Sequence, residues 1–214
     1  MKLKLMRNYF LLLFFIGIGS SIQAQETAMN ASEIAAFKEK VIASAKTTKT
    51  IKTDFVQYKH LDFLADDVKT SGKMVFKAPN LVKWEYTNPY QYSVIFKEDQ
   101  LLINDGGTKS KVDIGNSKLF KKLNQLIVNS VKGNMFNDAD FTVSFFKSPK
   151  YNKAVFIPKD KKIAGYIASF ELLFNKDDAQ VYEVKMVEPS QDFTRIVFSN
   201  RTLNSTINDS VFSN

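Results

Sequence analysis

A strict alternation of apolar and polar residues constrains the fold of this chain more than any other feature. In residues 68–78, one face carries Val, Thr, Gly, Met, Phe and Ala, whereas the other face is mostly Lys and Ser. The alternation resumes in residues 82–86 and 92–96, and the turn-forming pairs Pro79-Asn80 and Asn88-Pro89 separate the three segments. Such alternation predicts antiparallel strands that bury one face and leave the other in water. Tight turns between consecutive strands then favour a meander.

Further strand-like segments lie on both sides of this region. Asp105-Gly106-Gly107 is a hairpin signal, because Asp-Gly pairs readily adopt the positive φ angles of short turns. The other expected strands span residues 51–58, 101–104, 141–147, 153–158, 166–174, 180–187, 192–198 and 211–213.

Two segments have helical rather than strand-like periodicity. Residues 30–46 begin with Asn30 and Glu33, a spacing that resembles a capping box, and apolar residues then recur at three- and four-residue steps. Residues 116–132 repeat apolar residues in the same way and end before Gly133, a common residue after a helix C-terminus. We therefore expect two amphipathic helices.

Together these patterns predict a mainly β protein, in which ten or so antiparallel strands form a curled sheet or open barrel and the two helices cover its apolar face. The 19 Phe, 8 Tyr and 1 Trp residues give that face a large apolar area. A tight cover would make the face a sealed core, and a loose cover would make it a lipid cavity with a lid. Taken alone, alternating aromatic residues such as Trp84 are more typical of a sealed core.

The first 24 residues have the layout of a secretory signal peptide. Basic residues precede the apolar run of residues 10–18, and small residues lead to Ala24. This run is shorter than the roughly 20 residues that a membrane span needs. We expect cleavage after Ala24, export to a bacterial periplasm, and a single domain over residues 25–214.

The composition leaves few routes to catalysis or metal binding. The chain has no cysteine, and His60 is its sole histidine, which excludes thiolate chemistry and a His-based metal cluster. Carboxylate pairs such as Asp66-Asp67 and Asp177-Asp178 fall in expected turns, which Asp stabilises through its own side chain. We predict a protein that is not an enzyme and uses no metal or cofactor. A hydrolase built from distant carboxylates is the enzymatic alternative.

The 30 basic residues exceed the 22 acidic ones, but they are spread along the chain without a run of five. Solvated lysines on strands and turns explain this pattern better than a nucleic-acid groove. We therefore expect no nucleic-acid partner, while steering toward an acidic partner or an anionic membrane surface stays open.

One stretch resembles a known family. Residues 71–89 (SGKMVFKAPNLVKWEYTNP) closely resemble the run G-x-(apolar)-x-(apolar)-K-R-P-N-x-(apolar)-x-W of the periplasmic outer-membrane lipoprotein carriers, the LolA family. Other parts of the family pattern follow in the same order, at Phe55-x-Gln57, Asp105-Gly106, residues 192–198, Asn204 and Phe212.

The resemblance implies an unclosed antiparallel β-barrel with an α-helical lid over a hydrophobic cavity. Proteins of this family take triacylated lipoproteins from an inner-membrane ABC exporter, shield the acyl chains and deliver the cargo to an outer-membrane acceptor. It therefore implies acylated lipoproteins, such an exporter and an acceptor as partners of a carrier that we expect to be monomeric. The implied cavity residues are Phe55, Met74, Phe76, Val82, Trp84, Tyr86, Val94 and Phe96. The implied lid residues are Leu119, Leu123, Leu126 and Ile127.

The sequence departs from the family pattern in one important position. Where the family commonly has an arginine that holds the lid shut, this chain has Ala78, and Val82 replaces a frequent aromatic residue. These changes suggest a divergent member, which leaves open a carrier of a non-lipoprotein lipid in another outer-membrane export pathway. A lipid-binding sensor domain on the same barrel is a second alternative. An outer-membrane acceptor fits less well, because no cysteine follows the expected signal peptide to carry its lipid anchor.

Overall fold

Twelve antiparallel strands form one sheet in the computed structural model, which describes residues 26–114, 136 and 140–213. The strand order is β1-β8-β9-β10-β11-β12-β2-β3-β4-β5-β6-β7, so the chain forms two meanders, β2–β7 and β8–β12. The strands are β1 (Thr27–Ala28), β2 (Thr50–His60), β3 (Val68–Lys77), β4 (Leu81–Asn88), β5 (Tyr92–Lys97), β6 (Gln100–Asp105), β7 (Thr108–Asp113), β8 (Phe141–Lys147), β9 (Tyr151–Pro158), β10 (Ser169–Asn175), β11 (Val181–Val187) and β12 (Phe193–Leu203).

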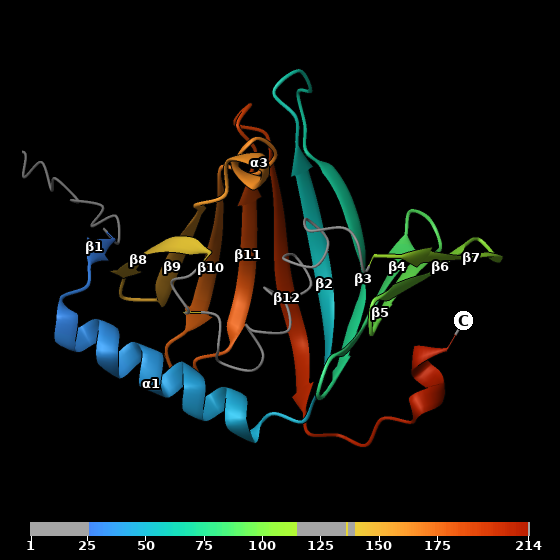
Figure 1. Ribbon diagram of the computed structural model, residues 1–214, viewed down its shortest axis with the longest axis horizontal. Helices are drawn as coiled ribbons and strands as arrows, with labels where there is room; N and C mark the ends of the chain where they lie inside the picture. The colour runs from blue at the N-terminus through green and yellow to red at the C-terminus, as the bar shows by residue number, and fades with distance from the viewer. Residues whose placement is uncertain (1–25, 115–135, 137–139, 214) are drawn as a thin grey trace, which may run out of the picture.

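The sheet is curled but not closed. The long strands β12 and β2 join the two meanders, with pairs that run from Phe193 opposite His60 to Leu203 opposite Ile51. Figure 1 shows the two meanders curving away from this central pair. The strands β1 and β7 stand at the two ends of the strand order and do not pair with each other. The prediction of an unclosed antiparallel barrel is therefore confirmed.

Helix α1 (Ala31–Thr47) lies across the β8–β12 half of the sheet (Figure 1). It begins at Asn30, whose side chain accepts a hydrogen bond from the Glu33 amide at 3.0 Å, while the Glu33 carboxylate accepts one from the Asn30 amide at 3.0 Å. This reciprocal pair is the capping box that the sequence predicted. Phe37 and Val41 of α1 are buried among Phe side chains of the sheet. One of the two predicted covering helices is thus present as expected.

The outer face of the sheet is not uniformly exposed to water. Ile95 on β5 packs with Ile207 and with Phe212 of the 3-10 helix η1 (Asp209–Phe212), and all three side chains are at most 5% exposed. The C-terminal segment therefore covers part of the convex face. The prediction that residues 211–213 form a strand is wrong, since Asn208 caps a 3-10 turn there by accepting a hydrogen bond from the Ser210 amide.

A few other elements differ from the sequence-based prediction. The segment predicted to begin a strand at residue 166 instead follows the short helix α3 (Lys161–Ala164), which Asp160 caps, and β10 begins three residues later. The edge strands β1 and β7 were not among the predicted strands. The predicted signal peptide of residues 1–24 and the predicted lid residues Leu119, Leu123, Leu126 and Ile127 lie outside the described residues.

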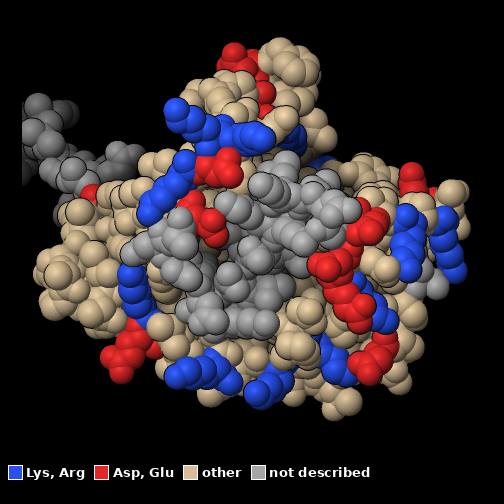
Figure 2. Space-filling view, viewed as in Figure 1, with Lys and Arg blue, Asp and Glu red and all other residues tan. Residues whose placement is uncertain are grey.

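Charged side chains of both signs are interspersed on the face shown in Figure 2, without a continuous basic stripe among the described residues of that view. Within the part of the chain that the structure describes, no helix has the length and apolar character needed to cross a membrane. His60 lies at the end of β2, where its ring stacks on Phe193 and its Nδ1 is 2.8 Å from the Asp67 carboxylate.

Candidate functional site

Three aromatic side chains meet on the concave face of β2 and β4. The Phe55 ring lies edge-on to Trp84 and to Tyr86, with ring centroids 4.9 and 5.1 Å apart. The Tyr86 hydroxyl donates a hydrogen bond to the Gln57 side chain at 3.1 Å. Burial, reinforced by neighbouring tyrosines, raises the pKa of Tyr86 to about 12, so its phenol stays a neutral donor. The Phe55-x-Gln57 and Trp84-x-Tyr86 motifs therefore contact each other.

Gly72 on β3 makes this contact between β2 and β4 possible. It pairs with Phe55 on one side and with Tyr86 on the other. A Cβ atom at Gly72 would lie 1.9 Å from the Glu85 carbonyl oxygen and 2.8 Å from the Tyr86 Cα. The glycine of the motif is thus required by the close approach of β4, which lets the two rings meet across β3.

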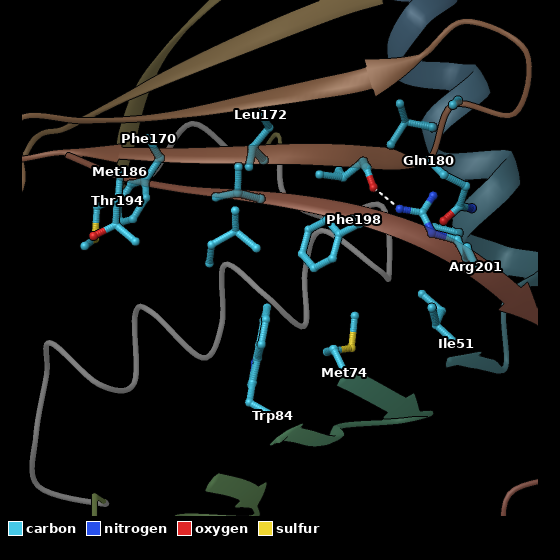
Figure 3. A pocket seen from close by; sticks show the side chains of 16 residues that line it. Ile51, Met74, Trp84, Phe170, Leu172, Gln180, Met186, Thr194, Phe198 and Arg201 are labelled. Atoms are coloured by element: carbon cyan, nitrogen blue, oxygen red, sulfur yellow. Dashed lines mark hydrogen bonds between the residues drawn. The ribbon is translucent and has the colours of Figure 1, made fainter. Parts of the chain in front are cut away.

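Beside this aromatic cluster lies a cavity of about 230 Å³ between α1 and the sheet. Figure 3 shows Trp84 and Met74 reaching toward Leu172 and Phe198 from the opposite wall. Most of the described lining is apolar, and the polar exceptions are Gln180, Thr194 and Arg201. The apolar lining residues are Val41, Ala45, Ile51, Met74, Trp84, Phe170, Leu172, Ala179, Val181, Val184, Met186, Ile196 and Phe198.

The predicted cavity residues fall into three groups. Met74 and Trp84 line the cavity. Phe55, Phe76 and Val82 are at most 1% exposed and form a sealed layer next to it. Tyr86 and Phe96 pack against that layer, and Val94 is the β5 partner of Trp84 in the sheet.

Most of the lining comes from α1 and from β10–β12. The helix was predicted to cover the apolar face, but no residue of β10–β12 was among the predicted cavity residues. The alternation that could have identified these strands is present, for example at Phe170-x-Leu172 and at Thr194-x-Ile196-x-Phe198. Every residue of β11 is only half-buried, Val184 and Met186 included. Val184 and Met186 thus keep part of their surface exposed in the lining, whereas Phe170 and Leu172 of the same lining are each only 7% exposed.

The polar residues Arg201 and Gln180 gather at one end of the cavity (Figure 3). The Arg201 guanidinium donates a hydrogen bond to the Val181 carbonyl. Burial lowers the pKa of Arg201, and the nearby Asp178 carboxylate partly offsets this effect. The Gln180 side chain donates to the Ser44 hydroxyl of α1 at 2.6 Å. Thr194 lies at the opposite end, beside Phe170 and Met186 (Figure 3).

This lining can bind apolar groups, but it has little capacity for acid–base chemistry. Among the described lining residues there is no Asp, Glu, His or Ser side chain. The paired acids Asp177 and Asp178 lie in the turn before β11, where the Asp178 carboxylate accepts a hydrogen bond from the Gln180 amide. Nowhere among the described residues do three His, Asp or Glu side chains gather to hold a metal.

The proline-containing run around Ala78 lies at the turn between β3 and β4, and the Ala78 amide donates a hydrogen bond to the Lys49 carbonyl.

A family model described as "Outer membrane lipoprotein carrier protein LolA" matches residues 46–214, which is most of the chain. The chain belongs to this family. LolA-family proteins are carriers that bind lipid or lipoprotein cargo in the periplasm or outside the cell.

Several solved structures match the chain at low sequence identity. An uncharacterized conserved protein from Thermus thermophilus gives a TM-score of 0.52 at 8% identity, over 84% of this chain and 91% of that chain. A LolA superfamily protein from Nitrosomonas europaea gives 0.46 at 9% identity, over 84% and 97%. A putative outer membrane lipoprotein-sorting protein domain from Vibrio parahaemolyticus gives 0.47 at 10% identity, over 84% and 94%. No curated protein sequence matched the chain.

Proposed function

We propose that this protein is a periplasmic carrier that shields the acyl chains of lipoproteins and ferries them from the inner to the outer membrane. The supporting observation is the cavity with a mostly apolar described lining between α1 and the sheet, in a chain of the LolA family. Burying an acyl chain there removes its methylene groups from water, which is worth about 0.8 kcal/mol for each one. Contacts of this kind are non-directional, so one cavity serves many cargo proteins that share only their lipid.

In this proposal, residues 1–24 direct export and are removed after Ala24. The mature chain then receives its cargo from an inner-membrane ABC exporter and passes it to an outer-membrane acceptor. Met74 and Trp84 contact the acyl chains directly, whereas Phe55, Phe76 and Val82 hold the wall in shape. Tyr86, Val94 and Phe96 extend the same wall. The residues Leu119, Leu123, Leu126 and Ile127 belong to a lid over the cavity.

Release of a lipoprotein from membranes tests the proposal directly. The purified exported protein is incubated with spheroplasts that make a labelled outer-membrane lipoprotein, and the soluble fraction is examined for a complex. We expect the labelled lipoprotein to appear in that fraction, bound to the protein. No release by a folded protein, with an exporter shown to be active, would contradict a lipoprotein carrier. Mass spectrometry of co-purified lipids would then identify a carrier of another lipid.

A charged side chain in the cavity wall should abolish loading. A carboxylate at Trp84 or Val184 would be desolvated by bound acyl chains at a cost of several kcal/mol, and each 1.4 kcal/mol is tenfold in affinity. We expect W84E and V184E to release at least about tenfold less lipoprotein than the wild type, with unchanged circular dichroism. I157E is the matched control, because Ile157 on β9 is 48% exposed. Equal release by all three variants would place the cargo outside the cavity.

The position of Ala78 offers a test of how release is controlled. The resemblance to the LolA family implies that an arginine at this position holds the lid shut, so we expect A78R to slow cargo transfer. Transfer would be followed as loss of labelled lipoprotein from the carrier to outer-membrane vesicles. An unchanged rate would show that release here is controlled differently.

A further inference from the structure

Arg201 reaches the cavity because of a local irregularity in β12. Thr194, Ile196 and Phe198 alternate along β12 and all line the cavity, so the regular pattern would place residue 200 there next. The register with β2 shifts between Ser199 and Thr202, which is a β-bulge.

The bulge changes which side chain faces the cavity. Asn200 has a φ of 51°, and its side chain instead donates a hydrogen bond to the Asp54 carboxylate at 2.8 Å. The extra residue brings Arg201 into the lining in its place. Bulges are a recognised means of re-aiming a side chain next to a functional site. The backbone conformation of β12 therefore places the Arg201 side chain, a cation, at this end of the apolar cavity.

Among the described residues, Arg201 donates a hydrogen bond to one acceptor, the Val181 carbonyl. A guanidinium carries five N–H donors, so several of them are left to bind a ligand in the cavity. No described carboxylate lies within salt-bridge distance of it. Asp178 influences it electrostatically, but the Asp178 carboxylate accepts its hydrogen bond from the Gln180 amide at 2.9 Å. A partly desolvated cation with free donors favours an anion beside it.

The size of the cavity limits the size of the ligand that can carry this anionic group. Its volume of about 230 Å³ lies below the roughly 300–1,000 Å³ of pockets for drug-sized ligands. A cavity of this volume favours a slender ligand such as a single acyl chain. The apolar walls run from Arg201 and Gln180 at one end to Phe170 and Met186 at the other (Figure 3).

We propose that the cavity binds a single-chain amphiphile, with the acyl chain along the apolar walls and an anionic head group, carboxylate or phosphate, paired with Arg201. The planar fork of arginine matches either oxyanion with two parallel hydrogen bonds. Gln180 lies beside this pair as a second polar side chain. The inference shares with the proposed function the premise that the cavity holds acyl chains, and it goes beyond that function, because its ligand is a single-chain anionic lipid and not an acylated lipoprotein.

The sequence contains one tryptophan, and Trp84 lines the cavity, so its fluorescence reports binding without a label. The delipidated protein would be titrated, below the critical micelle concentration, with palmitate, palmitoyl lysophosphatidate, uncharged monopalmitoylglycerol and sodium phosphate alone. We expect the two anionic lipids to bind more tightly than monopalmitoylglycerol, and phosphate without a chain to leave the fluorescence unchanged. The tighter anionic lipid identifies the preferred head group.

Variants separate the head group from the chain. A hydrogen bond to a charged group contributes about 1.5–3 kcal/mol, so R201Q should weaken both anionic lipids by about tenfold or more and leave monopalmitoylglycerol unchanged. R201K should keep part of the affinity, because it keeps the charge and loses the fork. R195Q is the matched control, since Arg195 lies on the same strand but donates to Glu183 at 3.3 Å instead of lining the cavity.

Two results would overturn the inference in different ways. If R201Q weakens charged and uncharged lipids equally, or weakens neither, the head group does not contact Arg201 while acyl binding and the proposed carrier function stand. If no acyl compound changes the fluorescence of the folded wild-type protein, the inference fails, whereas the proposed function is decided separately by the release of labelled lipoprotein from spheroplasts. Circular dichroism of each variant shows whether it is folded.

Discussion

At the scale of single residues, the family motif is explained by packing around Gly72. The glycine, the Phe55-x-Gln57 motif and the Trp84-x-Tyr86 motif are distant in sequence, yet they meet on three adjacent strands. They contribute to one contact, in which the Phe55 and Tyr86 ring centroids lie 5.1 Å apart across Gly72, which has no side chain. This motif therefore shapes the wall beside the cavity and stabilises the fold.

Replacing Gly72 by alanine should be strongly destabilising. The new Cβ would lie 1.9 Å from a backbone oxygen of β4, which cannot move aside like the end of a flexible side chain. We expect G72A to lose about 1–3 kcal/mol in the free energy of unfolding, measured by urea denaturation. G165A is the control, because a Cβ at Gly165 would meet its nearest atom only at 3.4 Å. Equal stability of the two variants would mean that β4 can shift.

Single residues also show where sequence reasoning ends. The alternation of Met74 with Trp84 and Tyr86 correctly indicated one inward face, because the period of a strand fixes which side chains share a face. It could not separate Trp84, which lines the cavity, from Phe76 and Val82, which are sealed. That difference depends on what lies across the fold. The position of Arg201 in the lining could not be predicted for another reason, since a β-bulge interrupts the two-residue alternation of β12.

At the scale of elements, α1 is fixed at its N-terminus by charge as well as by hydrogen bonds. Hydrogen bonds from the Lys147 side chain and from the Asn30 amide, and the charge of Lys147, lower the pKa of Glu33 below its usual value of 4.5. The Glu33 carboxylate therefore links α1 to β8. This end of the helix was predictable from sequence, because the capping box needs only residues three apart. The partner strand was not.

The link should make stability depend on pH. A carboxylate whose pKa is lowered by folding contributes stability above its unfolded pKa, and this stability is lost as the pH falls through the folded pKa. We expect E33Q to be less stable than the wild type at pH 7, with a difference that shrinks as the pH is lowered through the folded pKa of Glu33, by urea denaturation across this range. E39Q, on an exposed position of the same helix, should match the wild type throughout. A difference for E33Q that does not change with pH would mean that the charge of Glu33 is not its cause.

At the scale of the whole molecule, the sheet carries hydrophobic clusters on both faces. The C-terminal segment returns from β12 to the convex side, where Phe212 is 1% exposed beside Ile95. Lys77 holds this segment through hydrogen bonds to the Ile207 carbonyl at 2.9 Å and the Asp209 carboxylate at 2.5 Å. The lysine-rich outer face of β3 had suggested water on that side. The segment after residue 203 is too short to show a hydrophobic pattern, so its position over the convex face could not be predicted.

Removing the Phe212 side chain tests whether this outer cluster stabilises the fold. Burial of a phenylalanine in a closed site predicts a loss of about 3–5 kcal/mol for F212A in the free energy of unfolding. Lipid binding, followed by Trp84 fluorescence, should be unchanged under conditions where the variant is folded, because Phe212 lies on the other face of the sheet. Y166A is the control, since Tyr166 is 67% exposed and should change stability by less than about 0.5 kcal/mol.

The open edge of the sheet bears on how much the carrier can hold. In a closed barrel, the girth is fixed by strand number and stagger, and widening it means breaking a seam of hydrogen bonds. Here β1 and β7 are unjoined, so the curvature between the two meanders can change while every strand keeps its partners. For the proposed carrier, we therefore expect the two meanders to move apart around a larger cargo while the strand pairs stay intact.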